Sequence, residues 1–232
     1  AALKLKGEPP LILRRSDGYI GTLIDDLVTK GTNEPYRMMT SRSEYRLLHR
    51  QDNADKRLSG IGLRIGLVSE EQYRRVLDKY AAVDAELRRL EKTHIAPSDG
   101  INALLTARGT AEISTGSSLA DLIRRPQISY RDLAEFDPER PELPRAVTEQ
   151  AEISLKYEGY IKRQLKQVEE FTRMESRPLP ADIDYDAING LRLEAREKLK
   201  KIRPENFGQA SRISGVSPAD ISVLMIYMEG GR

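Results

Sequence analysis

The sequence predicts a mainly α-helical fold: a helical domain with two long helices, a small C-terminal helical bundle and a short β segment at the N-terminal end. Three observations lead to this fold class. The 232 residues are 39% hydrophobic and 32% charged, which suits a packed core beneath a strongly charged surface. Apolar residues recur at helical spacing over residues 69–93 and 145–175. Strand-like apolar runs occur only within residues 11–28.

The β segment is expected where two apolar runs, Leu11–Leu13 and Tyr19–Val28, flank the turn-forming sequence Ser16-Asp17-Gly18. Beyond about residue 40 we expect nearly everything to be helical. The clearest helix runs from Ser69 to about Thr93, because Ser69 and Gln72 form a capping box. Its apolar side chains are spaced three and four residues apart, which predicts a seam for a neighbouring helix.

The second long helix is expected over residues 145–175. On a helical wheel one face gathers apolar side chains, which predicts that this face is core. The face comprises Ile153, Tyr157, Tyr160, Ile161, Leu165, Val168 and Phe171. Between the two long helices we expect loops around one short helix in 97–118, then a helix over 119–125 and another around Asp132, capped by Ser129.

The C-terminal bundle is expected to follow a proline-containing linker at 177–180. Its helices are predicted at 191–202, just after Pro204, and from Pro218, where Ser217 caps the last helix. We therefore divide the chain into residues 1–65, 66–177 and 178–232. The lack of Cys excludes disulfides and thiolate metal sites, and two His are too few for a histidine-rich metal site.

Basic side chains gather in residues 37–64, where seven Lys or Arg face three acids, a net charge of 7 − 3 = +4. Arg42, Arg46 and Arg50 recur every four residues, which predicts a ladder on one helical face. An anionic group should compensate this ladder, and two alternatives stay open: a polyanion such as a nucleic-acid backbone, or acidic side chains elsewhere in the fold.

A second basic stripe is predicted on the helix over 145–175, where Lys156, Arg163 and Lys166 surround Gly159. A glycine within a helix costs about 1 kcal/mol relative to alanine, so it usually serves a purpose. Either a phosphate approaches the backbone there or another helix packs closely against it.

Three other motifs carry weaker signals. The glycines at 60, 62 and 66 resemble a dinucleotide fingerprint, but no strand precedes them, so Gly66 is expected to end a helix. Residues 209–228 imitate a helix-turn-helix, yet the second helix is almost entirely apolar, which favours burial or protein docking over DNA reading. Asp25, Asp26 and His49 form no catalytic constellation; as neighbours in a strand, the two Asp would point to opposite faces.

Five segments in series resemble the glucose-inhibited division protein A family, also called MnmG. They are EPYRMMTSRSEYRLLHRQDNADKRL (34–58), RIGLV (64–68), LIRRPQISY (122–130), KYEGYIKRQ (156–164) and GQASRISGVSPADISVL (208–224). The resemblance implies a tRNA-modifying flavoprotein that uses FAD, NADH and methylene-tetrahydrofolate. With the GTPase MnmE, such enzymes add an aminomethyl or carboxymethylaminomethyl group to C5 of the wobble uridine of certain tRNAs.

The family's flavin fingerprint and catalytic cysteines lie upstream, so the resemblance implies that this chain is a C-terminal portion, inactive alone, with no catalytic residue, cofactor or metal of its own. Residues 1–65 would be the tail of the flavin-binding domain and a connector. The full-length protein is expected to be a cytoplasmic homodimer that forms a heterotetramer with MnmE and has no membrane segment.

In this light the basic residues are expected to contact tRNA, and the last helix to dock the GTPase. The tRNA-binding candidates are Arg37, Arg42, Arg46, Arg50, Lys56, Arg57, Lys156, Lys162, Arg163 and Lys166. The docking candidates are Arg212, Ile221, Leu224, Met225 and Met228. Two alternatives remain: a DNA-binding helical module, and a protein-interaction domain whose arginine ladder is salt-bridged internally.

Overall fold

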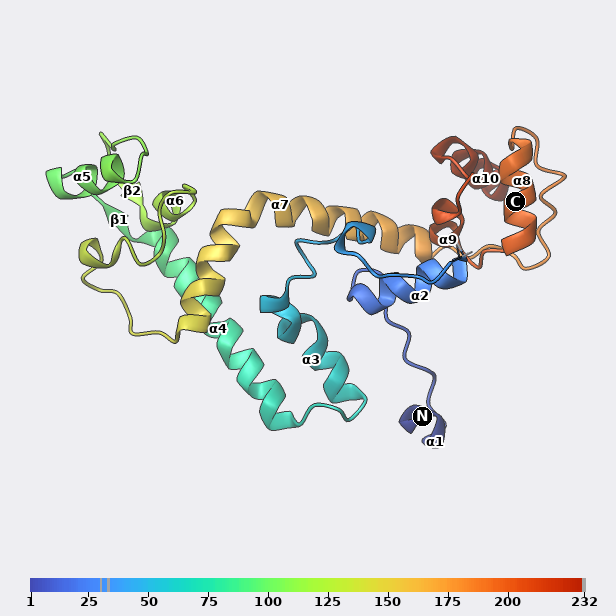
Figure 1. Cartoon of the computed structure of the whole chain (residues 1–232), viewed down its shortest axis with the longest axis horizontal. Helices are drawn as coiled ribbons and strands as arrows, with labels where there is room; N and C mark the ends of the chain where they lie inside the picture. The colour runs from blue at the N-terminus through green and yellow to red at the C-terminus, as the bar shows by residue number, and fades with distance from the viewer. Residues whose placement is uncertain (30, 33, 231–232) are drawn as a thin grey trace. The chain divides into compact units, whose positions relative to one another are not determined.

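The computed structural model describes residues 1–29, 31–32 and 34–230. Its chain forms two compact units, each built from two stretches of sequence (Figure 1). Residues 1–8 and 50–161 form unit 1, and residues 9–49 and 162–232 form unit 2. The helix α7 (Arg145–Glu175) contributes residues to both units. The predicted mainly α-helical class is confirmed.

Unit 1 is organised around α4 (Glu70–Lys92) and the first part of α7. It also contains α1 (Ala2–Leu5), the 3-10 turn η2 (Gln51–Asn53), α3 (Ala54–Arg64), α5 (Asp99–Ala107), α6 (Leu119–Ile123) and the 3-10 turn η3 (Ala134–Phe136). Two short strands, β1 (His94–Ile95) and β2 (Ser117–Ser118), pair antiparallel, with His94 opposite Ser118. The capping box is present as predicted: Ser69 Oγ accepts from the Gln72 amide, and Gln72 Oε1 accepts from the Ser69 amide.

The core of unit 1 lies around α6, whose apolar side chains are fully buried against residues of α4 and α5, including Leu90, Ile101 and Leu105. A charged cluster adjoins this core. Arg89 forms ion pairs with the buried carboxylates of Glu86 and Asp137, at 2.7 and 2.6 Å. The same Glu86 accepts a 2.8 Å hydrogen bond from the Tyr130 hydroxyl, so the buried charge is both neutralised and hydrogen-bonded.

Unit 2 contains α2 (Tyr19–Thr29), the 3-10 turn η1 (Thr40–Arg42), the last part of α7, α8 (Leu193–Ile202), α9 (Phe207–Arg212) and α10 (Pro218–Gly230). The predicted helices of the C-terminal bundle are thus confirmed. Their core gathers Tyr185, Ile188, Leu199, Phe207 and Leu224. Asp220 binds the Ser217 hydroxyl at 2.7 Å and its amide at 2.8 Å, which fixes the start of α10.

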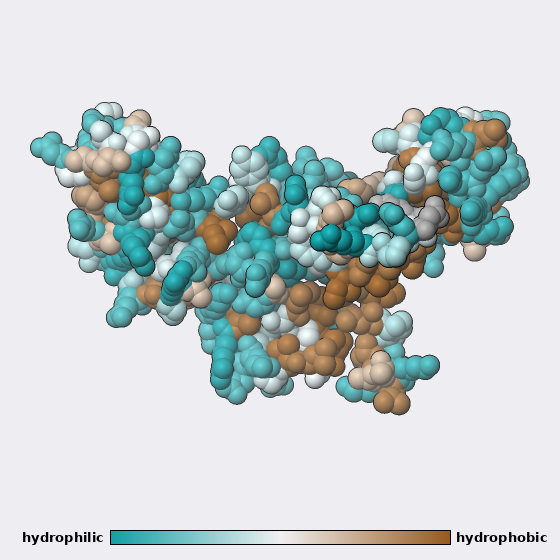
Figure 2. Space-filling view, in the orientation of Figure 1, coloured by the Kyte–Doolittle hydropathy of each residue, from teal (hydrophilic) through white to brown (hydrophobic). Residues whose placement is uncertain are grey.

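The predicted β segment is wrong. Residues 19–29 form the helix α2, and no described residue within 11–28 lies in a strand. The apolar residues of this run recur in pairs four residues apart, which is a helical period. The helix is inverted in polarity, since Thr22, Asp26 and Thr29 are buried while Ile20, Ile24, Leu27 and Val28 are exposed. Figure 2 shows these apolar side chains gathered over α2.

Two further expectations need correction. No α-helix forms around Asp132: residues 130–133 are turns that lead into η3, while Asp132 Oδ2 binds the Ser129 amide and hydroxyl. The predicted core face of α7 is also wrong over its middle, where Tyr160 is 55% and Leu165 46% exposed. Early in α7 the buried side is instead formed by Val147, Gln150, Ala151 and Leu155. A wheel finds an apolar stripe but not whether anything covers it.

Candidate nucleic-acid interface

A buried ion network anchors the arginine-bearing segment of unit 2. Arg15 lies between α2 and the turn after η1, and its guanidinium contacts Asp26 at 2.8 Å, Asp25 at 3.0 Å and Glu44 at 2.7 Å. Burial alone would lower the pKa of Arg15, but the hydrogen bonds with Glu44 and Asp26 raise it above its ordinary value. Because α2 is a helix and not a strand, its two adjacent carboxylates reach the same cation.

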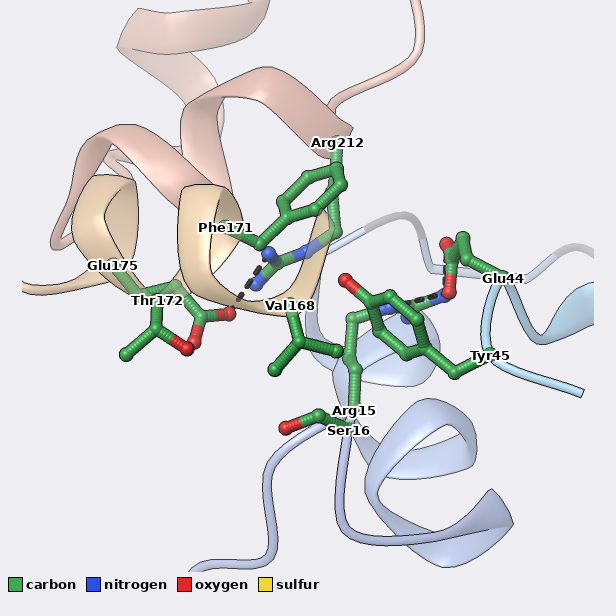
Figure 3. A pocket seen from close by; sticks show the side chains of 9 residues that line it. All are labelled: Arg15, Ser16, Glu44, Tyr45, Val168, Phe171, Thr172, Glu175 and Arg212. Carbon is green, nitrogen blue, oxygen red and sulfur yellow. Dashed lines mark hydrogen bonds and ion pairs between the residues drawn. The ribbon is translucent and has the colours of Figure 1, made fainter. Parts of the chain in front are cut away.

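A second buried arginine extends this network. Arg212 of α9 forms ion pairs with Asp25 at 2.8 Å and with Glu175 of α7 at 2.9 Å. Figure 3 shows Arg212 directed at Glu175, and Arg15 at Glu44, around a small cavity also lined by Val168 and Phe171. The side chain of Arg212 is only 8% exposed, which corrects the expectation that it docks a partner. It joins α2, α7 and α9 internally.

The turn over residues 43–49 is fixed on both sides. Tyr45 is buried and meets Phe171 edge to face, with ring centroids 6.3 Å apart, and burial raises the pKa of Tyr45 to about 12. Gln164 of α7 donates a 3.1 Å hydrogen bond to the Glu44 carbonyl. His49 is buried, with Nδ1 3.1 Å from Ser43 Oγ and Nε2 2.9 Å from the Ser16 carbonyl. These contacts give His49 a structural role.

This anchoring leaves three arginines on the surface of unit 2. Arg37, Arg42 and Arg46 have exposed side chains, and Arg42 lies over the Tyr36 ring at 4.7 Å. Within the described ranges, Arg37 and Arg46 make no ion pair. The predicted helical ladder is wrong, because Arg42 ends η1 and residues 44–49 form turns and a bend. Of the three, Arg46 lies on the fixed turn, and Arg37 and Arg42 precede it in the sequence.

The last part of α7 adds more basic side chains to unit 2. Lys162, Arg163 and Lys166 are exposed, on the side of the helical wheel opposite Val168 and Phe171. Gly159, which precedes them, has open space beside it. A Cβ added at this position would meet no atom of a neighbouring described segment within 4 Å. Close helix packing therefore does not explain this glycine.

Four predicted tRNA contacts lie in unit 1 and have internal partners. Arg50 Nε is 3.2 Å from Asp52, and the Lys56 ammonium lies 4.7 Å above the Tyr80 ring. Arg57 Nε donates to Asn53 Oδ1 at 3.0 Å. Lys156 pairs with Glu152 at 2.9 Å. A surface pair of this kind contributes little to stability, so its cation can exchange the internal partner for a phosphate. These four residues are therefore less available to tRNA than Arg37 and Arg46.

The docking residues predicted on α10 differ in how deeply they are buried. Ile221 and Leu224 are buried in the core of unit 2, which corrects their assignment to a docking surface. Met225 and Met228 are half-buried against the same core. The large apolar side chains that α10 exposes are Ile226, at 69%, and Tyr227. An almost wholly apolar helix gives no periodic signal that separates the two sides.

The glycines at 60, 62 and 66 form no cradle for a flavin or a nucleotide. Gly60 and Gly62 lie inside α3, and a Cβ at Gly62 would come within 2.5 Å of Val68 Cγ2, so this glycine serves packing. Gly66 has φ +78° just after α3 ends, as expected of a helix-terminating glycine. Among the described residues, no group of three or more His, Cys, Asp or Glu could hold a metal ion. None of the described helices combines the length and low polarity of a membrane span.

Comparisons with known proteins give a consistent result. The family described as tRNA modifying enzyme MnmG/GidA C-terminal helical domain matches residues 70–165, and the MnmG/GidA C-terminal helical bundle matches residues 167–232. Together they cover most of the chain, in the order in which the sequence motifs occur.

Curated relatives and a solved structure agree. The tRNA uridine 5-carboxymethylaminomethyl modification enzyme MnmG of Caldicellulosiruptor saccharolyticus is 58% identical over 229 residues, 99% of this chain and 37% of the relative. The enzyme of the same name from Enterococcus faecalis is 57% identical over 233 residues, covering 100% of this chain and again 37% of the relative. The chain thus spans well under half of these relatives.

The structure of Aquifex aeolicus GidA superposes with a TM-score of 0.76 at 42% identity, covering 97% of this chain and 35% of that one. These findings confirm the resemblance inferred from the five sequence motifs. The chain belongs to the MnmG/GidA family, and its residues 70–165 and 167–232 correspond to the family's C-terminal helical domain and C-terminal helical bundle.

Proposed function

We propose that this chain is the tRNA-binding and partner-docking region of an enzyme that modifies the wobble uridine of certain tRNAs. The observation that carries the proposal is the pair Arg37 and Arg46, exposed and without an ion pair among the described residues. Arg46 lies on the turn over residues 43–49 that buried charges anchor, and Arg37 precedes that turn in the sequence. The exposed side chains of Lys162, Arg163 and Lys166 extend the basic character of unit 2.

The chemistry of these groups suits a phosphate backbone. A guanidinium offers a planar fork of donors that matches two phosphate oxygens. Neutralising phosphates releases condensed counterions, so such contacts give affinity that falls steeply with salt and depends little on base sequence. The fixed turn lowers the entropy cost of binding, because the backbone that carries the arginines is already ordered.

The whole enzyme would combine this region with chemistry located elsewhere. By the family resemblance it would use FAD, NADH and methylene-tetrahydrofolate, bound outside this chain, to add a (carboxymethyl)aminomethyl group to C5 of the uridine. Residues 1–65 would be the tail of the flavin-binding domain and its connector. We further propose a cytoplasmic homodimer that works with the GTPase MnmE, and we assign docking on α10 to the exposed Ile226 and Tyr227 with Met225 and Met228 beside them.

The proposal is tested by equilibrium binding of unmodified tRNA to the 232-residue chain at one fixed salt concentration. The variant Arg37→Ala/Arg46→Ala should bind more weakly than wild type by at least tenfold, on the order expected for two lost phosphate contacts. The matched control is Arg74→Ala/Arg88→Ala, which removes two exposed arginines from α4 and changes the net charge equally. Equal losses in both variants would mean that only the total charge matters, and would refute the assignment.

A duplex DNA competitor in the same experiment separates the alternative of a DNA-binding module. The second helix of such a module would need several exposed polar side chains that read bases. In α10, Ser222 and Glu229 are exposed but have internal partners, Pro218 and Arg177, and the large exposed side chains are Ile226 and Tyr227. We therefore expect tRNA to displace duplex DNA far more effectively than the reverse. A pure protein-interaction domain would bind neither.

A further inference from the structure

Unit 2 has a cavity beside α2 that the phosphate contacts do not use. It is open to solvent, measures about 460 Å³, and is lined by Asp26, Gly31, Thr32, Glu34, Pro35, Tyr36 and Arg42. Pockets that take small ligands begin at about 300 Å³. The cavity is therefore large enough for one aromatic heterocycle.

Arg42 and Tyr36 form one part of the lining, and we call this pair the platform. The guanidinium of Arg42 lies 4.7 Å from the centroid of the Tyr36 ring, so the two planar groups are associated. Hydrogen bonds to the buried network fix both residues. The Tyr36 hydroxyl donates a 2.7 Å hydrogen bond to Asp26 Oδ2, and the carbonyl of Arg42 accepts one from Arg15 at 3.5 Å. Because Arg15 also pairs with Asp26, the buried network that fixes the turn fixes the platform as well.

The charges of the lining do not favour a phosphate. Asp26 is already paired with Arg15, so among the described lining residues the carboxylate of Glu34 and the guanidinium of Arg42 balance each other. A phosphate in this cavity would meet no net positive charge from these groups, whereas the uncharged face of a base needs none. The carboxylate of Glu34 is exposed and offers acceptor oxygens to an N–H group on the edge of a base.

We propose that this cavity binds one unpaired nucleobase of the bound RNA, stacked on Tyr36 and Arg42, with Glu34 accepting a hydrogen bond from the base. Aromatic side chains and guanidinium planes are the usual stacking partners of bases splayed out of single-stranded RNA. The inference rests on the proposed function, in which Arg37 and Arg46 contact phosphates. It gives Arg42 a different role from theirs.

The test uses a stem–loop RNA with an unpaired loop, and a set of the same RNAs in which one loop nucleotide at a time is abasic. Wild-type chain should lose about tenfold in affinity at one loop position, the size of a single stacked base. In Tyr36→Leu this loss should vanish, since the variant can no longer stack the base and binds both RNAs equally. Tyr36→Phe keeps the ring without its hydrogen bond and should retain most of the effect.

Arg42→Lys separates stacking from charge, because lysine keeps the positive charge but has no planar group. It should lose most of the sensitivity to the abasic position, with little change in the salt dependence. A wild-type chain that binds the RNA but responds to no abasic substitution, or a response that persists undiminished in Tyr36→Leu, would overturn the base pocket and leave the phosphate contacts standing. Failure of the RNA to bind wild type at all would overturn both proposals.

Discussion

Replacing Arg15 by Met should destabilise unit 2 strongly, because it removes a buried cation that pairs with three carboxylates. Three carboxylates share Arg15, but they are not equally exposed. The side chain of Glu44 is 40% exposed and can be hydrated, and Asp25 keeps Arg212 at 2.8 Å. Asp26 is 3% exposed, so the pair that it forms with Arg15 at 2.8 Å is held away from water. Removing one partner of a buried pair costs about 3–5 kcal/mol, and with one carboxylate this deeply buried we expect about 3 kcal/mol.

Urea denaturation followed by circular dichroism measures this loss, since the chain has no Trp for fluorescence. The two units can unfold in separate transitions, and the loss should fall on the transition of unit 2. The double variant Arg15→Met/Asp26→Asn also removes the most deeply buried of the three carboxylate charges, so it should recover part of the lost free energy of unfolding. A loss below about 1 kcal/mol in Arg15→Met, typical of an exposed ion pair, would refute the view that this network anchors the turn.

Three other predictions concern local features. The ion pair with Arg192 holds the pKa of Asp220 well below its usual range. The stability that ionised Asp220 contributes is therefore present above about pH 4 and is lost as the pH falls further. The variant Asp220→Asn should flatten this part of the curve of unfolding free energy of unit 2 against pH, and an unchanged curve would contradict the prediction. Arg203 has φ +48° after α8, so Arg203→Gly should stabilise unit 2 by about 0.5–1 kcal/mol and raise its midpoint in a thermal melt, and a lowered midpoint would contradict the prediction. Ser69→Ala breaks the capping box with Gln72 and should lower the free energy of unfolding of unit 1 by about 1 kcal/mol in chemical denaturation. A loss seen only in the transition of unit 2 would contradict this prediction.

Helices with their own start and stop signals could be predicted from the sequence. The capping box at Ser69 and the Ser217-Pro218 start both occur as expected, since these signals depend only on residues within one turn. The sequence does not reveal the helix α2, because its apolar run also suits a strand and its buried side is polar. Burial of Asp26 depends on Arg15, a residue 11 positions away whose role no local pattern reveals.

The candidate site was predictable in composition but not in arrangement. The spacing of Arg42, Arg46 and Arg50 suits a helix, yet Tyr45 is buried against Phe171 and the turn is fixed by contacts across more than 100 residues of sequence, such as Gln164 with Glu44. Arg212 shows the reverse problem: its sequence surroundings suggest an exposed helix end, while two carboxylates from distant elements bury it. An ion pair between residues far apart in the sequence produces no periodic pattern from which it could be predicted.

The measurement that tests the central claim most directly is the salt dependence of tRNA binding by this chain. The logarithm of affinity should fall linearly with the logarithm of salt concentration, at a slope of nearly one per phosphate contacted. Arg37→Ala/Arg46→Ala should make that slope shallower by about two, while the control Arg74→Ala/Arg88→Ala leaves it unchanged. A slope that is the same in all three proteins would contradict the claim that the anchored turn of unit 2 contacts the tRNA backbone.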